Sequence, residues 1–302
     1  MPELPEVHTT ATILSSLIKG KKIFNVWTDY FSDAYQGKVN IKNKKYFLTF
    51  KKNCINRKIK NVWRKAKYVL IELDNDSTIV IHMKMTGHLL YGSYLFNSKT
   101  KKWEAGSGGP LQDPFNRFIH LIFDFGDKTH LAFSDMRKFA TVYLVKNKKE
   151  LEEKFKKFGP EPLDDSFTWK TLKEMLQKKP NQKIKTTLMN QELVSGIGNI
   201  YSDEILWESK INPEKIVATI TDKQYKTLTK NIKNILSKGI NFGGDSMSDY
   251  RNPYGEPGQF QLHHKVYRRK GEKCNRKTCT GKILRKVINT RSAHYCSVCQ
   301  KF

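Results

Sequence analysis

The sequence predicts an α+β protein in which an N-terminal helix packs on a β-sandwich or barrel, a helical region follows, and a cysteine-bearing β-hairpin comes last. Three observations support this fold class. Apolar residues recur at helical spacing within the first 18 residues. Short runs of alternating apolar and polar residues, typical of strands, come next. Beyond a Pro- and Gly-containing break the spacing is helical again, and four of the five cysteines lie in the last 29 residues.

The first region combines one helix with short strands. Apolar residues from Val7 to Ile18 share one face of the predicted helix, and Gly20 ends it. The strand pattern is interrupted at residues 91–115 by Gly106, Gly108, Gly109 and Pro110, and we expect an exposed loop there. We expect strands at residues 67–73, 78–83, 117–125 and 129–133, with turns at residues 74–77 and 126–128.

A change of composition near residues 149–165 predicts a domain boundary. Gly159-Pro160-Glu161-Pro162 cannot continue a helix. We therefore expect an N-terminal domain at residues 1–150, a helical domain at residues 151–262, and a cysteine-bearing segment at residues 263–302. Helices are expected at residues 169–177, 184–189, 200–209 and 222–238, followed by a loop rich in Gly, Ser, Asp and Pro at residues 243–258.

The net charge favours a polyanionic partner. The chain has 55 Lys and Arg against 29 Asp and Glu, a formal charge of +26 and a sequence pI near 9.7. Residues 42–67 alone contain eleven Lys or Arg and no acid, a pattern usually found on a solvated face.

No run approaches the ~20 apolar residues of a membrane span, and the N-terminus has no basic and apolar leader. We expect a cytoplasmic monomer that does not enter a membrane.

The N-terminal stretch Pro2-Glu3-Leu4-Pro5-Glu6 permits two interpretations. It has the residues of an ordinary helix start, with proline and acids in the first turn. If Met1 is removed, however, the Pro2 nitrogen becomes a secondary amine with a reference pKa of about 8, which leaves part of it neutral and nucleophilic. Attack on a sugar aldehyde carbon would form an iminium ion, with Glu3 and Glu6 close by.

The cysteines Cys274 and Cys279, separated by four residues, and Cys296 and Cys299, separated by two, have the spacing of a four-thiolate Zn²⁺ site. A closed shell of four thiolates leaves no position for water, so we expect one structural Zn²⁺ rather than a catalytic ion. The alternative is a set of buried or unrelated cysteines. Twelve basic residues and one acid fall within residues 265–301, which favours a contact with DNA over a solvated zinc ribbon of other purpose.

A glycine-containing turn at residues 193–201 precedes a predicted helix, and Asn199 can cap that helix. The exposed N–H groups of a helix N-terminus form a phosphate site. The alternative is an ordinary turn.

Together these segments resemble the formamidopyrimidine-DNA glycosylases, the bacterial type that removes oxidised purines. The resemblance extends over nearly the whole chain. It rests on Pro2-Glu3-Leu4-Pro5-Glu6-Val7, Ala66-Lys67-Tyr68, His82-Met83-Lys84-Met85-Thr86-Gly87, Asp135-Met136-Arg137-Lys138-Phe139, Gly159-Pro160-Glu161-Pro162-Leu163, Gly196-Ile197-Gly198-Asn199-Ile200-Tyr201 and the cysteine finger.

The resemblance implies a helix-two-turn-helix domain, a zinc finger and the roles of five catalytic residues. Pro2 corresponds to the Schiff-base nucleophile that attacks the sugar C1′, and Glu3 to the general acid and base. Glu6 matches a supporting carboxylate. Lys67 corresponds to a hairpin lysine that contacts phosphate and donates a proton in β-elimination. Arg291 matches a finger arginine associated with flanking phosphates and δ-elimination.

The resemblance also implies DNA contacts. His82, Lys185 and Asn199 match phosphate contacts. Met85, Arg137 and Phe139 correspond to side chains that fill the space left by an extruded base and hold its partner. Without the resemblance, core packing is the simpler interpretation of Met85 and Phe139, and a satisfied structural histidine is that of His82.

Some positions depart from the family pattern. The first cysteine pair is separated by four residues where two are common, Met136 and Ala140 replace the usual proline and glycine, and residues 91–115 form a longer stretch than usual. Leu4 favours the purine branch over its pyrimidine-specific sister, and residues 243–260 resemble the purine branch's loop over the flipped base.

The sequence therefore predicts a bifunctional DNA glycosylase and abasic-site lyase that acts on double-stranded DNA containing an oxidised purine. Three alternatives stay open: an endonuclease VIII-type enzyme for oxidised pyrimidines, a non-catalytic zinc-finger protein that binds nucleic acid, and an RNA-binding or ribosome-associated protein.

Overall fold

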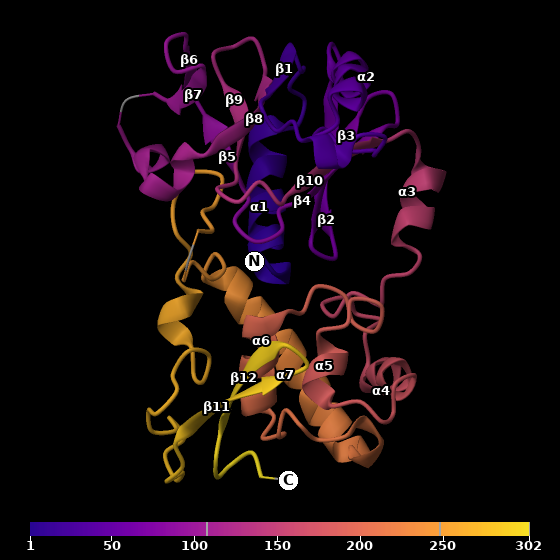
Figure 1. Cartoon of the computed structure of the whole chain (residues 1–302). Coiled ribbons are helices and arrows are strands. Elements are labelled where there is room, and N and C mark those ends of the chain that lie inside the picture. Colours follow the sequence, from indigo (N-terminus) through magenta and orange to yellow (C-terminus); the bar gives the residue numbers. More distant parts are fainter. Residues whose placement is uncertain (107, 248, 302) are drawn as a thin grey trace. The chain divides into compact units, whose positions relative to one another are not determined.

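A computed structural model describes residues 1–106, 108–247 and 249–301 (Figure 1). Residues 107 and 248, within the predicted loops at 91–115 and 243–258, lie outside this description. The chain divides into two compact units. The first contains Met1–Lys156 and Phe242–Gln259, and the second contains Lys157–Asn241 and the chain from Phe260 onward. Within the described ranges, every helix is too short or too polar to cross a lipid bilayer.

The first unit is a β-sandwich with a helix against it, as the sequence predicts (Figure 1). Helix α1, Leu4–Ile18, packs on β2, β3 and β5 through an apolar face that includes Val7, Leu14 and Ile18. Both sheets are antiparallel and meet across one apolar core. Their strand orders are β1-β8-β9-β5 and β10-β4-β3-β2, with bounds β1 Asn25–Thr28, β2 Ile59–Lys65, β3 Tyr68–Leu73, β4 Thr78–His82, β5 His88–Gly92, β8 Ile119–Asp124, β9 His130–Ser134 and β10 Thr141–Val145.

The basic run at residues 42–67 is more than a solvated face. It forms helix α2, Lys44–Cys54, whose N-cap is Asn43 and which buries Phe47, Phe50 and Cys54 in the core. The lysines occupy the opposite face. This helix was missed because the charges dominate the composition while only three residues carry its apolar face. A further helix, α3 at Lys148–Phe155, ends the sandwich region.

The expectation of a single exposed loop at residues 91–115 is wrong. Strands β6, Tyr94–Asn97, and β7, Lys102–Ala105, form a hairpin, and 3₁₀ turns η2, Pro110–Gln112, and η3, Pro114–Arg117, follow it. Tyr94 is buried, and Trp27 packs edge-on against Trp103. The predicted strand at 117–125 consequently begins only at Ile119, because η3 occupies the residues before it.

The second unit is helical and ends in a hairpin, as predicted. Its main helix, α6, is buried on most sides and packs on α5, α7 and β12. The hairpin turns at Asn289 and Thr290, which both have positive φ, the conformation that suits a two-residue turn between twisted strands. The bounds are α4 Trp169–Gln177, α5 Ile184–Leu188, α6 Asn199–Glu208, α7 Asp222–Asn241, β11 Ile283–Ile288 and β12 Arg291–Cys296, with 3₁₀ turns η4 Val217–Thr219 and η5 Phe260–His263 and, in the first unit, η1 Asp33–Tyr35.

Candidate functional site

The start of α1 places two buried carboxylates beside Pro2. Pro2 is buried, whereas Met1 before it is exposed. Glu3 is the N-cap residue and Glu6 is the third helical residue, and they form a capping box in which Glu3 N–H donates to Glu6 Oε2 at 2.7 Å. The sequence-predicted residues Pro2, Glu3 and Glu6 are therefore held together by the first turn of one helix.

Glu6 also holds a distant segment of the first unit. Its Oε1 accepts a hydrogen bond from Asp245 N–H at 2.7 Å, and its backbone carbonyl accepts one from the Tyr250 hydroxyl at 3.0 Å. Gly244 has a φ of +89°, and a Cβ there would lie 2.8 Å from Glu6 Cγ, so only glycine fits this approach. Gly244, Asp245 and Tyr250 thus lie directly against the helix start, and Glu6 positions them.

Lys67 lies in a tight turn rather than in the strand that the sequence predicts. Ala66 and Lys67 form the two-residue turn between β2 and β3, closed by the pairing of Lys65 with Tyr68, and Ala66 has a φ of +50°. The Lys67 side chain is largely buried, with 5% of the residue exposed. A two-residue turn between paired strands is rigid, so Lys67 is still held in place.

His82 ends β4 next to this turn, with its ring edge-on to Tyr68 at 4.6 Å between centroids. Burial, assisted by the charges of Lys84 and Lys67, lowers the pKa of His82 to about 3. Its Nδ1 accepts a hydrogen bond from Lys84 N–H at 3.0 Å. The ring is therefore neutral at pH 7, and its proton lies on Nε2, which is a hydrogen-bond donor.

Met85, Arg137 and Phe139 form an exposed cluster. Met85 is 42% exposed and Phe139 is 48% exposed, so core packing is excluded for both. Arg137 Nη1 lies 3.7 Å from Met85 Sδ, and its guanidinium lies 4.5 Å from the centre of the Phe139 ring. Two loops that are 52 residues apart in sequence thus present one apolar and cationic tip.

A buried carboxylate supports that tip. Asp135 is fully buried and accepts hydrogen bonds from the Thr86 hydroxyl, from Tyr30 Oη at 2.5 Å and from Ala140 N–H at 2.9 Å. Thr86 Oγ1 in turn accepts from Arg137 N–H at 3.1 Å. This network joins the two loops, and it requires neither the proline nor the glycine that Met136 and Ala140 replace.

Sequence reasoning missed a second support of the same tip. The Lys42 ammonium donates to the backbone carbonyl of Lys138, a residue with φ of +52°, and stacks over the rings of Tyr30 and Tyr35. Burial lowers the pKa of Lys42. Lys42 lies in the basic run at residues 42–67, and a buried lysine cannot be told from its solvated neighbours by composition alone.

In the second unit, Lys185 and Asn199 lie together. Lys185 is 1% exposed; its ammonium donates to Asp203 Oδ1 at 2.5 Å and to the Asn199 carbonyl at 3.4 Å. Asn199 is the first residue of α6, and the preceding Gly198 is the N-cap. Among the described residues, Asn199 Oδ1 has no hydrogen-bond partner although it is buried. Lys185 therefore supports the N-terminus of α6.

Two acids of α6 attach the C-terminal segment to this unit. Asp203 Oδ2 accepts from both the backbone N–H and the ring of His294 at 2.9 Å. The carboxylate of Glu204 accepts from three successive backbone N–H groups, those of residues 265–267, at 2.8 to 3.0 Å. The sequence analysis did not single out either acid. Adjacent Asp and Glu on an otherwise apolar helix indicate such a role, because a buried carboxylate needs hydrogen-bond donors around it. Arg291 lies at the exposed start of β12, beside the hairpin turn.

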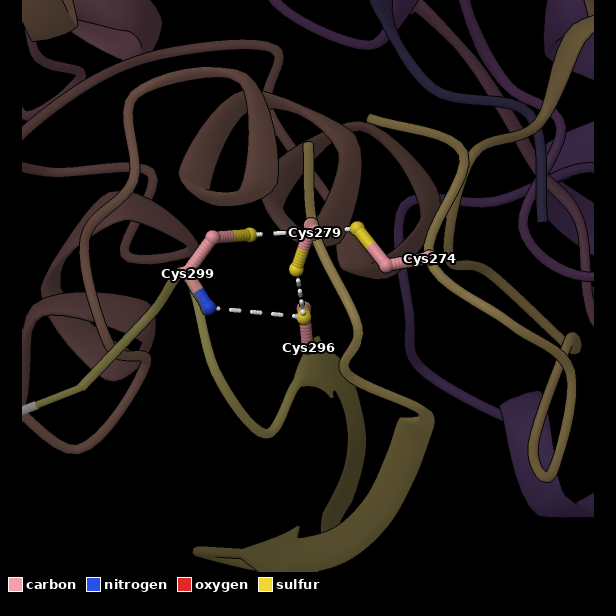
Figure 2. A group of neighbouring side chains, drawn as sticks. All are labelled: Cys274, Cys279, Cys296 and Cys299. Carbon is pink, nitrogen blue, oxygen red and sulfur yellow. Dashed lines mark hydrogen bonds between the residues drawn. The ribbon is translucent and has the colours of Figure 1, made fainter. Parts of the chain in front are cut away.

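The four cysteines converge on one point (Figure 2). Their sulfur atoms all lie within 4.8 Å of one another, with Cys274 to Cys299 at 3.8 Å and Cys279 to Cys296 at 3.4 Å. A tetrahedral Zn²⁺ with bonds of about 2.3 Å places its sulfur ligands about 3.8 Å apart, so the group fits such an ion. Gly281 is required here, because a Cβ would lie 2.6 Å from Cys296 Sγ. The cysteines are clustered, as predicted, rather than unrelated.

The widened pair Cys274 and Cys279 is anchored by a residue between them. Arg276 lies over the Trp207 ring at 4.1 Å and donates to the Trp207 carbonyl at 2.6 Å, at the C-terminal end of α6. The Trp207 indole N–H donates to Cys274 Sγ at 3.4 Å. Burial opposes ionisation of Cys274, but hydrogen bonds with Arg276 N–H, Trp207, Cys296 and Cys279 outweigh it and lower the pKa of this thiol to about 7. Burial raises the pKa of Cys296 and of Cys299.

An exposed apolar tip beside an arginine is typical of proteins that insert side chains into stacked bases and distort duplex DNA. Comparisons with known proteins specify the family. Residues 1–142 match the formamidopyrimidine-DNA glycosylase N-terminal domain, and residues 158–251 match the formamidopyrimidine-DNA glycosylase H2TH domain. The chain belongs to the formamidopyrimidine-DNA glycosylase family.

Relatives named formamidopyrimidine-DNA glycosylase match over the whole length. The protein from Halalkalibacterium halodurans is 38% identical and covers 100% of both chains, and that from Bacillus subtilis is 36% identical and covers 99% of both. Among solved structures, a complex of a Lactococcus lactis Fpg variant with DNA containing Fapy-dG is 32% identical, with a TM-score of 0.82 and 100% of both chains covered. A complex of Lactococcus lactis Fpg with DNA containing an abasic site has the same identity and TM-score, with 99% and 100% covered.

Proposed function

We propose that this chain is a base-excision repair enzyme that removes oxidised purines, formamidopyrimidines and 8-oxoguanine, from duplex DNA and then nicks the strand. The observation that carries the proposal is the placement of Pro2, Glu3 and Glu6 at one helix start in a chain of this family. Like its relatives in complex with DNA that holds Fapy-dG or an abasic site, the chain would take such DNA as its substrate.

In this proposal Pro2 is the nucleophile. Removal of Met1 converts its amide nitrogen into a secondary amine, which attacks C1′ of the damaged nucleotide as the base leaves. The resulting iminium ion makes the neighbouring sugar C–H acidic, so the C3′ and then the C5′ phosphate leave by β- and δ-elimination. Glu3 protonates the opening sugar and later transfers protons. Glu6, whose two oxygens are occupied by Glu3 and Asp245, holds the site in shape.

Phosphate contacts fall on residues from both units. Lys67, in its rigid turn, contacts phosphate and donates the proton in β-elimination, and the neutral His82 offers its Nε2–H to a phosphate oxygen. In the second unit, Asn199 at the start of α6 binds phosphate while Lys185, buried against Asp203, supports it. Arg291, exposed beside the hairpin turn, contacts the flanking phosphates and assists δ-elimination.

The tip formed by Met85, Arg137 and Phe139 enters the base stack. Extrusion of the damaged base costs a few kcal/mol of unstacking and unpairing, and apolar side chains that take its place offset part of that energy. Arg137 can donate to the base edge of the unpaired cytosine. The buried Asp135 network keeps the tip in one conformation before DNA binds.

The four cysteines would hold one Zn²⁺, which supplies a structural cross-link and no reaction step, because the four-thiolate set leaves no open position. Its effect is to fix the β11–β12 hairpin and thus Arg291.

We place the enzyme in the cytoplasm, on the nucleoid if the cell is bacterial, and as a monomer.

Borohydride trapping on a duplex with an abasic site tests the proposal. We expect the wild-type protein to form a covalent adduct that peptide mapping assigns to residue 2. Pro2→Gly should form far less adduct while it still binds lesion DNA, because a primary amine replaces the secondary amine and the DNA contacts are unaltered. A mature protein that retains Met1, or an adduct on an internal lysine, would contradict the proposal.

Excision and binding measurements, together with the trapping assay, separate the alternatives. Faster excision of dihydrouracil than of 8-oxoguanine from defined duplexes would favour the endonuclease VIII type. Lesion binding without any adduct would indicate a non-catalytic protein, and a strong preference for RNA over lesion duplex would indicate an RNA-binding one.

A further inference from the structure

The described residues of the segment Phe242–Gln259 contact the rest of the first unit at two separate places. Its first half lies against Glu6, through Asp245 N–H and the Tyr250 hydroxyl. Its second half lies against residues in and beside the stretch at 91–115, among them Tyr91 and Asp113. If the sugar of the damaged nucleotide is bound at Pro2, its base lies near this helix start, which the first half of the segment borders.

Arg251 is the main contact of the second half. It is 6% exposed, its Nε donates to Asp113 Oδ2 at 3.1 Å, and its guanidinium lies 4.6 Å from the centre of the Phe115 ring. Its Nη1 donates to the carbonyl of Tyr250, the residue that reaches Glu6. Arg251 therefore links the stretch at residues 91–115 directly to the residue that contacts the catalytic helix.

Backbone contacts reinforce this link. Tyr91 N–H donates to the Pro253 carbonyl at 2.7 Å, and Asn116 Nδ2 donates to the Gly255 carbonyl at 3.1 Å. Asn116 is itself buried, and its Oδ1 lies 2.9 Å from His88 Nε2. Gly255 has a φ of +89°, and a Cβ there would lie 2.8 Å from the Pro110 carbonyl oxygen. The turn at residues 252–256 is thus built to fit the stretch that precedes β8.

We propose that Arg251 and Asp113, with Phe115 and Asn116, form a clamp that fixes residues 242–259 against Glu6 and so positions this segment on the damaged base. Arg251 and Asp113 are positioning residues, since neither touches the reacting atoms. The inference rests on the proposed function. It assigns a role in excision of the base to the stretch at residues 91–115 and to Asn116. It predicts no role for them in cleavage of an abasic site, where no base is present.

The test compares two single-turnover reactions of each full-length variant: excision of 8-oxoguanine from a duplex and nicking of the same duplex with a preformed abasic site. We expect Arg251→Leu to slow excision by about tenfold, as for loss of a charged hydrogen bond, while abasic nicking changes by less than about twofold. Asp113→Asn is a milder change at a partly exposed residue. It should also lower the ratio of the excision rate to the nicking rate, by less than Arg251→Leu. Arg251→Lys should recover part of the excision rate.

A matched control removes an ion pair elsewhere in the first unit. Lys60 pairs with Asp76 on the surface at 3.2 Å, and Lys60→Met should leave both reactions unchanged. Combining Arg251→Leu with Asp113→Asn should slow excision no further than Arg251→Leu alone, because the two act as one unit. Equal losses in both reactions, additive losses, or normal excision by both single variants would overturn the clamp. If wild-type protein carries out neither reaction, the proposed function fails and the clamp fails with it.

Discussion

Glu6 and Glu3 are three residues apart, yet we propose different tasks for them. Both oxygens of Glu6 accept backbone N–H donors, one from Glu3 and one from Asp245. A carboxylate that accepts two backbone N–H groups is well suited to hold two segments together. Glu3 directly follows Pro2 in the chain, so we propose Glu3 as the acid and base. Sequence spacing alone places both carboxylates in the first turn and cannot separate these tasks.

His82 provides a test at the scale of one residue. Its pKa of about 3 lies below the 6.5 of an unfolded chain, so below pH 6.5 the unfolded state binds a proton that the folded state does not. The free energy of unfolding should therefore fall as the pH is lowered from about 6.5 towards 3. Between pH 7.5 and pH 4.5 the contribution of His82 is roughly 2 to 3 kcal/mol.

Urea unfolding of wild type and His82→Gln at both pH values measures this contribution. The variant, which cannot take up the proton, should lose roughly 2 to 3 kcal/mol less than wild type on acidification. Equal losses in the two proteins would show that His82 is already protonated in the fold. The Nδ1 contact with Lys84 N–H could then not exist as described.

At the scale of elements, the sequence predicts those whose signal is local. Helices α1, α4 and α7 have apolar residues on one face, and the β11–β12 hairpin is bracketed by cysteine pairs. Elements that depend on distant partners were missed. The β6–β7 hairpin is recognisable only once Trp27, from β1, packs against Trp103. The supports of the site, such as Asp135 under Thr86, join loops far apart in sequence and carry no local pattern.

The cysteine cluster provides a test at this scale. Wild-type protein should contain about one Zn²⁺ per chain by elemental analysis, and Cys279→Ser should lose it. Because the hairpin then loses its cross-link, affinity for lesion duplex should fall by about tenfold or more, through loss of contacts such as Arg291. Cys54→Ala is the matched control, since Cys54 is buried in α2, away from the cluster, and should retain both metal and affinity. Full affinity in metal-free Cys279→Ser would contradict a role of the finger in binding.

At the scale of the whole molecule, the basic residues behind the charge of +26 are of two kinds, which burial alone does not distinguish. Some are expected to contact phosphate, and the others form a solvated surface. The lysines of α2 illustrate the second case, because they cover the outer face of a helix whose inner face holds Phe47 and Phe50 in the core. We propose Arg291, at the exposed start of β12, as an example of the first.

The salt dependence of binding separates these two populations of charge. Each phosphate contact releases counterions, so six to ten contacts should weaken affinity for lesion duplex by about 10³ to 10⁵ between 50 and 200 mM salt. Arg291→Ala should reduce the slope of log K against log salt by about 1, because one contact is lost. Lys45→Ala, at an exposed position of α2, should leave that slope unchanged. If both variants reduce the slope equally, the basic face of α2 also lies on DNA, and the charge serves binding over a far larger surface than the residues placed here.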